Sequence, residues 1–461
     1  MISLSLSEAA RATGGVLSGP GDSLFNGVAT DTRTLRGGEL FVCLQGPNFD
    51  AHDFLAVARD AGVAGAVVKE GMGSKVDSDG ARIEVGDTRV ALADLARHWR
   101  RRFAGKVGAL TGSNGKTSVK EMAASILRVS QRVHATQGNL NNDIGVPLTL
   151  LGLGNDHDCA VIEMGANHPR EIETLTAIAE PDAGLVNNAG PAHLEGFGSL
   201  DGVARSKGEL FEGLPDGALA IINADDPYAR LWCGMASTRP LMRFGLERGV
   251  EIRGAWEPTT NGGRLRAETP AGAIDVDMAV SGRHNGMNAL AATALALSLD
   301  ASVQDVEQGL ASFRPVGGRL RALAGPAKST ILDDTYNANP ASLAAGVAVL
   351  VARPGAAWLV LGDMGELGAM GAELHERAGD DAREAGVRRL FALGPVAAGA
   401  ARAFGPGGTS FDSFEALMQG LRRALEEEGD ASVSVLVKGS RTMRMERVVN
   451  ELATHGEVST H

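Results

Sequence analysis

Cysteine and aromatic residues are scarce in this sequence. Its 461 residues include three cysteines, and aromatic side chains make up 4% of the total. Cys43, Cys159 and Cys233 are odd in number and far apart, and they lie in apolar surroundings such as the run Phe-Val-Cys-Leu at 41–44. We therefore expect buried free thiols in a reducing compartment and no disulfide framework.

Long apolar runs and excess positive charge are also lacking. No segment has 18 uninterrupted apolar residues, and the first seven residues lack the basic start and apolar stretch of a signal peptide. The formal net charge of -12 repels polyanions. We expect a cytoplasmic protein with no transmembrane segment and no nucleic-acid partner.

The length and the order of apolar runs predict three domains. A chain of 461 residues is too long for one hydrophobic core, and 44% hydrophobic with 22% charged residues is usual for a folded protein. Short apolar runs alternate with helical patterns from about residue 106, and the alternation starts again after residue 316. Because buried parallel strands under helices produce this alternation, we predict an α/β protein with domains at 1–105, 106–316 and 317–461.

Each domain has an expected architecture. The first is a small α/β unit, the second has a mostly parallel sheet, and the third is a Rossmann-like, doubly wound sheet. Turn residues between alternating strands at 250–280 predict an antiparallel flap on the second sheet. The strands expected in the two larger domains are 107–111, 159–164, 185–187, 218–223, 330–332, 358–361, 389–393 and 433–437.

The strongest local motif is a phosphate-binding loop. An apolar strand ends at Leu110, Thr111-Gly112-Ser113-Asn114-Gly115-Lys116-Thr117 follows, and a helix is expected to about Ser130. Small residues let backbone N–H groups surround phosphates, while the helix N-terminus and Lys116 add positive charge. The common P-loop has glycine where this chain has Leu110, so the loop is a shortened variant. The alternative is a glycine-rich turn without a ligand.

Three further residues could complete a magnesium site beside this loop. Thr117 is placed to meet the ion, and Glu163 ends an expected strand, at the sheet edge where ligands bind in α/β proteins. His193 follows the next strand. The alternatives are that Glu163 caps a turn and that His193 is structural.

Four segments resemble the Mur ligases, which build the peptide of bacterial cell-wall precursors. They are the loop at 111–117, Glu-Met-Gly-Ala at 163–166, the stretch 187–198 with His193, and Arg-Ser-Lys-Gly-Glu at 205–209. The resemblance covers essentially the whole chain. Segments 138–147, 333–340 and 361–368 are similar to the member that acts on UDP-N-acetylmuramoyl-tripeptide and D-alanyl-D-alanine. The Asp-Asn-Pro-Arg segment usual in the ligase that adds the third amino acid is absent from the sequence.

The resemblance implies an ATP-dependent amide ligase. ATP would phosphorylate the tripeptide carboxylate, and the amine of D-alanyl-D-alanine would attack the acyl phosphate to give UDP-N-acetylmuramoyl-pentapeptide. This step belongs to peptidoglycan synthesis, and so to cell-wall biogenesis, cell shape, cell division and the cell cycle. The three domains would bind the uridine nucleotide, ATP and the incoming dipeptide in that order, and we expect a monomer. The third residue of the tripeptide, meso-diaminopimelate or lysine, stays open.

The resemblance also implies roles for the residues at the centre of the reaction. Lys116, Glu163, His193 and Lys207 form the expected catalytic set. Thr117 and Glu163 would hold one magnesium ion, and His193 would help to hold a second. Relatives carry a carbamylated lysine at the position of Lys207, whose added CO2 makes an anion that steadies magnesium. The alternative for Lys207 is an ordinary lysine on a helix surface.

The remaining expected contacts lie around this centre, and each has an alternative. Asn285 and Asn288 would contact adenine or else cap a helix, and Arg319 would reach the phosphates or form an interdomain salt bridge. The expected substrate contacts are Thr32 and Arg33 for the uridine nucleotide, Asn139 and Asn142 for the muramoyl tripeptide, and Asp334, Tyr336, Asn337 and Asn339 for the dipeptide. The alternatives are a plain turn at 31–33, an Asx turn at Asn139 and Asn142, and a packing role for Tyr336.

Two other functions stay open on the sequence alone. One is a related amide ligase, such as the enzyme that extends folate with glutamate. The other is a nucleotide-switched binding protein that changes domain angle with ATP and makes no amide.

Overall fold

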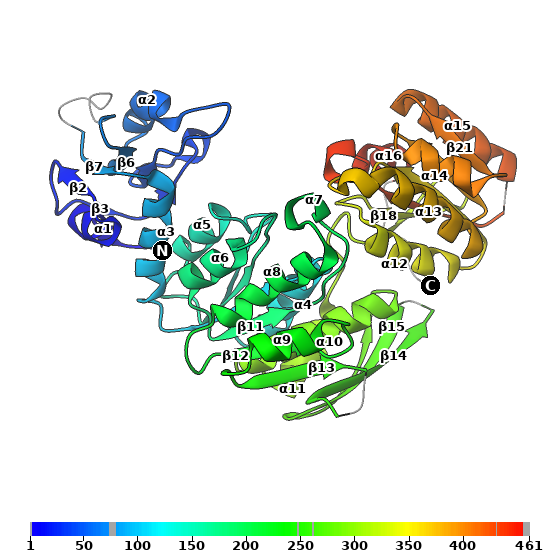
Figure 1. Ribbon diagram of the computed structural model, residues 1–461, viewed down its shortest axis with the longest axis horizontal. Helices are drawn as coiled ribbons and strands as arrows, with labels where there is room; N and C mark the ends of the chain where they lie inside the picture. Colours follow the sequence, from blue (N-terminus) through cyan, green and yellow to red (C-terminus); the bar gives the residue numbers. More distant parts are fainter. Residues whose placement is uncertain (1, 73–79, 247–248, 261, 430, 455–461) are drawn as a thin grey trace.

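The computed structural model describes residues 2–72, 80–246, 249–260, 262–429 and 431–454. Figure 1 shows three α/β units in chain order, with the central unit between the other two. No helix within these ranges combines the length and apolar character that a membrane crossing needs.

The first unit has a small mixed sheet. Its strand order is β2-β7-β6-β5-β4, and only the β2–β7 pair is antiparallel. The strands are β2 (Val16–Ser18), β4 (Val28–Ala29), β5 (Leu40–Val42), β6 (Gly65–Lys69) and β7 (Arg82–Val85), with β1 (Leu4–Ser5) and β3 (Leu24–Phe25) paired separately. The helices are α1 (Leu6–Thr13), α2 (Leu55–Asp60) and α3 (Thr88–Arg100).

The central unit has a nine-stranded sheet of order β16-β15-β14-β13-β12-β11-β8-β10-β9. All neighbours from β9 to β14 are parallel, and β15 and β16 add an antiparallel extension, which confirms the mostly parallel sheet with its flap. The strands are β8 (Lys106–Thr111), β9 (Val133–Ala135), β10 (Cys159–Glu163), β11 (Ala183–Val186), β12 (Leu219–Asn223), β13 (Leu241–Gly245), β14 (Ile252–Thr259), β15 (Gly262–Thr269) and β16 (Gly272–Met278). The helices are α4 (Lys116–Leu127), α5 (Gly145–Leu151), α6 (Glu171–Ala179), α7 (Leu194–Phe197), α8 (Leu200–Glu212), α9 (Ala229–Met235), α10 (Arg283–Ser298) and α11 (Val303–Ser312).

The last unit is doubly wound. Its strand order is β17-β18-β22-β19-β20-β21, and only the edge pair β17–β18 is antiparallel. The strands are β17 (Arg321–Ala324), β18 (Thr330–Asp334), β19 (Ala356–Gly362), β20 (Arg389–Leu393), β21 (Gly408–Phe411) and β22 (Val433–Lys438). One core packs α12 (Pro340–Val351), α13 (Gly371–Glu384) and α14 (Ala397–Phe404), and the other packs α15 (Phe414–Glu428) and α16 (Glu446–Leu452).

Two details differ from expectation. Cys43 and Cys159 are buried, with burial raising the pKa of each thiol to about 12, but Cys233 is only half-buried; all three are free. The strands β9, β13, β17 and β21 were not predicted, because they are short or carry charged and polar residues and so lack a continuous apolar run.

The helix that follows the phosphate loop is packed tightly from behind. Helices α10 and α11 lie against α4, and α11 approaches α4 most closely at Gly309. A Cβ on Gly309 would lie 2.3 Å from the Cα of Ile126. Because Ile126 lies near the C-terminal end of α4, this contact fixes the end of the helix that is farther from the loop.

Gly309→Ala should lower the free energy of unfolding by about 1–3 kcal/mol, because the added methyl group meets backbone that cannot move aside. The measurement is urea unfolding. Gly234→Ala in α9 is the control, since a Cβ there meets nothing within 4 Å and alanine favours a helix by up to about 1 kcal/mol. Equal stability of Gly309→Ala and the parent would contradict the packing argument.

Candidate active site

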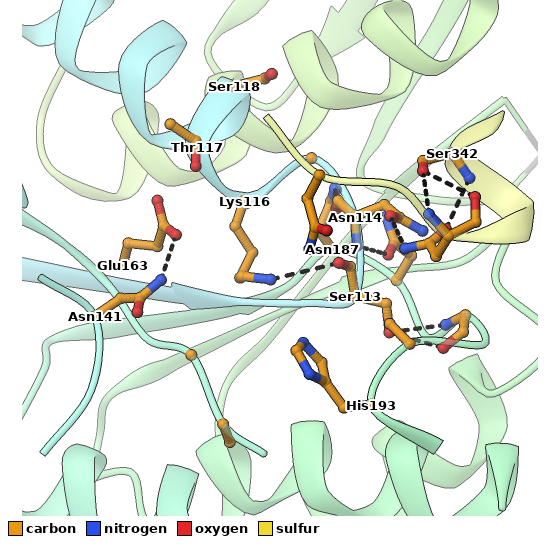
Figure 2. A pocket seen from close by; sticks show the side chains of 18 of the residues that line it. Ser113, Asn114, Lys116, Thr117, Ser118, Asn141, Glu163, Asn187, His193 and Ser342 are labelled. Carbon is orange, nitrogen blue, oxygen red and sulfur yellow. Dashed lines mark hydrogen bonds between the residues drawn. The ribbon is translucent and has the colours of Figure 1, made fainter. Parts of the chain in front are cut away.

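A cavity of about 1070 Å³ lies at the carboxyl edge of the central sheet. Strands β8, β10, β11 and β12 end there, and the last unit closes part of the cavity with residues from β18, α12 and β22. Figure 2 shows the loop, Glu163 and His193 around the same space. The structure thus brings most of the predicted site residues together.

The phosphate loop is held by its neighbours. A Cβ on Gly115 would lie 2.4 Å from Asn288 Oδ1 and 2.8 Å from Asn187 Nδ2, so only glycine fits. Its φ of 79° also favours glycine. No side chain caps α4, so N–H groups at its start stay available to an anion. Thr111 is fully buried and donates to the carbonyl of Met164 at 2.8 Å, which places its side chain behind the cavity.

Lys116 lies over the loop that it follows. Its Nζ donates to the carbonyl oxygen of Gly112 at 2.7 Å and to that of Ser113 at 3.4 Å. Burial lowers the pKa of this ammonium group, and the negative charge of Glu163 opposes that effect. The positive charge of Lys116 therefore lies directly beside the loop.

Glu163 is buried with one oxygen unsatisfied. The residue is 2% exposed, Oε1 accepts from Asn141 Nδ2 at 2.9 Å, and Oε2 has no partner among the described residues. Leaving a buried polar atom unpaired costs roughly 1–3 kcal/mol, so a cation at Oε2 would be favoured.

Magnesium suits this donor set. The hydroxyl of Thr117 lines the same cavity, and both candidate ligands are hard oxygens. Within the described residues, no group of three or more His, Cys, Asp or Glu side chains could hold a metal. Magnesium commonly uses one or two protein oxygens together with substrate phosphates and waters, so this sparse set fits it.

His193 reaches the last unit. It precedes α7 with a φ of 54°, and its Nδ1 lies 2.5 Å from Glu366 Oε2. The hydrogen bond from His193 lowers the pKa of Glu366. The imidazole lines the cavity and joins two units.

Lys207 is enclosed inside the central unit. It is 1% exposed, its Nζ lies 3.5 Å from the carbonyl of Ala166 and 5.2 Å from the centre of the Phe197 ring. Burial, reinforced by the charge of Lys116, lowers the pKa of the Lys207 amine to about 7. The alternative of an ordinary surface lysine is therefore wrong.

Asn285 and Asn288 line the cavity behind the loop. Asn288 Oδ1 accepts from Asn187 at 3.0 Å, and Asn285 donates to the carbonyl of Ser281 at 2.9 Å. Helix α10 is preceded by Gly282 and has no side-chain cap, so the capping alternative is wrong.

Two contacts tie the last unit to the loop. Arg319 Nη2 donates to Thr117 Oγ1 at 3.3 Å, and its guanidinium lies 4.0 Å from the centre of the Tyr336 ring. Asn339 Nδ2 donates to Asn114 Oδ1 at 2.8 Å. Within the described residues Arg319 forms no ion pair and its buried Nε has no partner, so the alternative of an interdomain salt bridge does not hold there.

The other predicted dipeptide contacts also line the cavity. Asp334 Oδ2 lies 2.5 Å from Lys438 Nζ, which donates to the carbonyl of Asn337 at 3.0 Å as well. Asp334 and Lys438 are both buried, so the charge of the aspartate is compensated. Tyr336 lines the cavity under Arg319 instead of packing in the core.

Of the residues predicted to bind substrate in the first half of the chain, some line the cavity and others lie outside it. Asn139 and Asn142 line the cavity, although Asn142 Oδ1 accepts from the Gly145 N–H at 2.9 Å, as the Asx-turn alternative predicted. Thr32 and Arg33 lie outside this cavity in a short 3₁₀ turn, where Arg33 is paired with Asp31. The sequence analysis missed Asn141, because only the folded chain brings it to Glu163.

Comparison with known proteins decides the family. The Mur ligase middle domain matches residues 110–296, and the domain described as "Mur ligase, glutamate ligase domain" matches residues 318–441. The chain belongs to the Mur ligase family. This Mur ligase is 43% identical to the UDP-N-acetylmuramoyl-tripeptide--D-alanyl-D-alanine ligase of Escherichia coli over 99% of its own length and 100% of the relative's.

Solved structures agree with that assignment. MurF from Acinetobacter baumannii matches with a TM-score of 0.92 at 34% identity, covering 98% of this chain and 99% of that one. MurF from Thermotoga maritima in complex with ADP matches with a TM-score of 0.80 at 28% identity, covering 92% and 96%. The Mur ligase architecture therefore extends over nearly the whole chain.

Lys207→Met should stabilise the protein in CO2-free buffer, because it removes an amine whose protonation burial opposes. The pKa of the Lys207 amine is 10.5 in the unfolded chain and about 7 in the folded chain. Between these two pH values the unfolded chain binds more protons, so the free energy of unfolding of the parent protein rises with pH. The advantage of Lys207→Met should be on the order of 2–3 kcal/mol at pH 8 and shrink by roughly 1 kcal/mol per pH unit toward pH 10. Urea unfolding at several pH values measures it; a difference that does not change with pH would contradict the lowered pKa.

Proposed function

We propose that this Mur ligase joins D-alanyl-D-alanine to UDP-N-acetylmuramoyl-tripeptide and converts ATP to ADP and phosphate. The cavity supports this proposal most directly, because one space brings the phosphate loop, Glu163 and a polar pocket of the last unit together. The E. coli relative is a ligase of this activity, the A. baumannii relative is a MurF, and the T. maritima MurF is found in complex with ADP.

ATP would lie with its phosphates on the loop and its adenine toward α10. Residues 112–117 would wrap the phosphates, with Lys116 and Arg319 compensating their charge, and the unpaired Nε of Arg319 supports that role. Asn285 and Asn288 would contact the adenine side. Magnesium held at Thr117 and Glu163, with a second ion near His193, would supply the positive charge that lets the triphosphate and a carboxylate approach each other.

The reaction would proceed in two displacements. A carboxylate oxygen of the tripeptide attacks the γ-phosphorus, the bond from that phosphorus to the β,γ-bridging oxygen breaks, and ADP leaves. The free amine of the dipeptide then attacks the acyl carbon, loses a proton, and phosphate leaves as the amide forms. Closure of the cavity between the units would keep water from the acyl phosphate.

The substrate ends would be held by different units. Asn139 and Asn142 would contact the peptide of the first substrate, and Thr32 with Arg33 would contact its uridine nucleotide. Tyr336, Asn337 and Asn339 would contact the dipeptide, with Asp334 and Lys438 forming the base of that pocket. The hydrogen bond between Asn339 and Asn114 supports a link between dipeptide binding and the loop.

Lys207 would act as a carbamate. CO2 reacts with a neutral amine, and the pKa of about 7 keeps a large fraction of the Lys207 amine neutral near neutral pH. The carbamate would place an anion beside Lys116, at an amine whose pKa is lowered first by burial and then by repulsion from Lys116.

Mass spectrometry of products tests the proposed reaction. Incubation with ATP, magnesium, D-alanyl-D-alanine and either the diaminopimelate or the lysine form of the UDP-tripeptide should yield the pentapeptide from at least one form. The A. baumannii relative is a D-alanyl-D-alanyl ligase whose named substrate contains 2,6-diaminopimelate, which favours the diaminopimelate form. Phosphate release with folate and glutamate, or ATP binding without any pentapeptide, would favour one of the alternative functions.

Lys116→Met should reduce ligation at least about 10³-fold, because the charge beside the transferred phosphate is lost. Lys106→Met is the matched control: this exposed lysine at the other end of β8 forms a surface ion pair with Asp300 and should leave the rate within about twofold. Phosphate release gives both rates. A Lys116→Met enzyme with parental activity would remove the loop from the mechanism.

Lys207→Ala should lose ligation and regain part of the rate when formate or acetate is added, because a small carboxylate can replace the carbamate. Initial rates over a range of acid concentrations measure the recovery. An unaffected Lys207→Ala enzyme would rule out the carbamate role, and a loss without any recovery would argue for a purely structural one.

A further inference from the structure

The side chain of Asn141 makes a single polar contact that bears on the proposed reaction. Its Nδ2 donates to Glu163 Oε1 at 2.9 Å, as suits an amide N–H facing a carboxyl oxygen. Figure 2 shows this bond on one side of the carboxylate, with the second oxygen of Glu163 directed toward the side where Thr117 lies. The amide therefore fixes which oxygen is left for a cation.

The asparagine is itself held in place. Its backbone carbonyl accepts from the Gly165 N–H at 2.7 Å, and a Cβ on Gly165 would lie 3.0 Å from Asn141 Cγ. The amide thus packs on a glycine that leaves room for it. Both contacts are made by Gly165, which lies two residues after Glu163 at the end of β10. The end of this strand therefore positions both Asn141 and Glu163.

The segment that contains Asn141 makes a second contact with Glu163. The Glu163 N–H donates to Thr136 Oγ1 at 2.9 Å, and the carbonyl of Thr136 accepts from the buried Lys120 Nζ at 2.6 Å. Residues 136–141 therefore contact Glu163 at its backbone and at its carboxylate. Lys120 lies one turn after Lys116 on α4, which links the segment to the phosphate-loop helix.

The chemistry of an amide suits this position. A lysine or arginine at Asn141 would neutralise the carboxylate, and an aspartate would repel it, whereas an amide donates a hydrogen bond without changing the charge. Glu163 keeps its full negative charge for Lys116 and for a metal ion. Groups that orient a metal ligand in this way commonly change metal affinity 10–100-fold when they are removed.

We infer that Asn141 is a positioning residue for the magnesium ligand Glu163: it binds Oε1 and thereby holds Oε2 toward the phosphate site. The inference rests on the proposed function, which assigns magnesium to Glu163 and Thr117. Since Asn141 lies between Asn139 and Asn142, the segment proposed to meet the tripeptide also sets the geometry of the metal ligand.

Nucleotide binding without turnover tests this inference. Calorimetry with a non-hydrolysable ATP analogue, in excess magnesium and in EDTA, gives the factor by which magnesium tightens binding. Asn141→Leu, which keeps the size but removes the donor, should reduce that factor about tenfold or more and leave the affinity in EDTA unchanged. Asn141→Ala should do the same, and thermal unfolding checks that both variants fold.

A control and a double variant make the test specific. Leu140→Ala alters an exposed neighbour in the same segment that makes no polar side-chain contact and should keep the parental magnesium effect. Glu163→Gln should lose the effect, and adding Asn141→Leu to Glu163→Gln should cost nothing further, because the two residues act as one.

Three results with the variants would overturn the inference. They are a parental magnesium effect in Asn141→Leu, equal losses with magnesium and with EDTA, and full additivity in the double variant. A parent protein that binds the analogue equally well without magnesium would also overturn it. Failure of the ligation reaction itself shows only in the product assay, because this binding test uses neither peptide substrate.

Discussion

The structure depends on gathering buried charges at one edge of the central sheet. Glu163 and Lys207 are buried there and Lys116 is partly buried, and an uncompensated charge in such surroundings is expensive. The ammonium group of Lys116 donates to loop carbonyls and lies near the negative charge of Glu163. One carboxyl oxygen of Glu163 has no partner among the described residues, and the pKa of Lys207 is lowered. This edge therefore holds a buried carboxylate with one unpaired oxygen beside two lysines whose pKa values are lowered.

The sheet makes this arrangement possible. Parallel strands β8, β10, β11 and β12 end at the same edge, so residues far apart in sequence meet without long loops. Helix α10 packs against α4 and brings Asn288 to Gly115 at the start of that helix, while α11 packs near its other end at Ile126. Apolar side chains packed beneath this edge stabilise the fold and offset the unfavourable free energy of burying charge there.

Contacts between units extend the site beyond the central sheet. His193 pairs with Glu366, Asn114 accepts from Asn339, and Arg319 reaches Thr117 while it stacks on Tyr336. Each contact joins a cavity-lining residue of the central unit to a residue of the last unit. The two units therefore share one site, as the proposed reaction needs.

The sequence by itself determined the features that depend on neighbours along the chain. The loop at 111–117, the eight apolar strands, the antiparallel flap and the family could be predicted, because periodicity, turn residues and motif order are local properties. Only the tertiary structure decided that Lys207 is buried, that Asn141 binds Glu163 and that His193 faces Glu366. These outcomes depend on which distant residues share a cavity, and no local pattern encodes the desolvation or the hydrogen-bond partner that results.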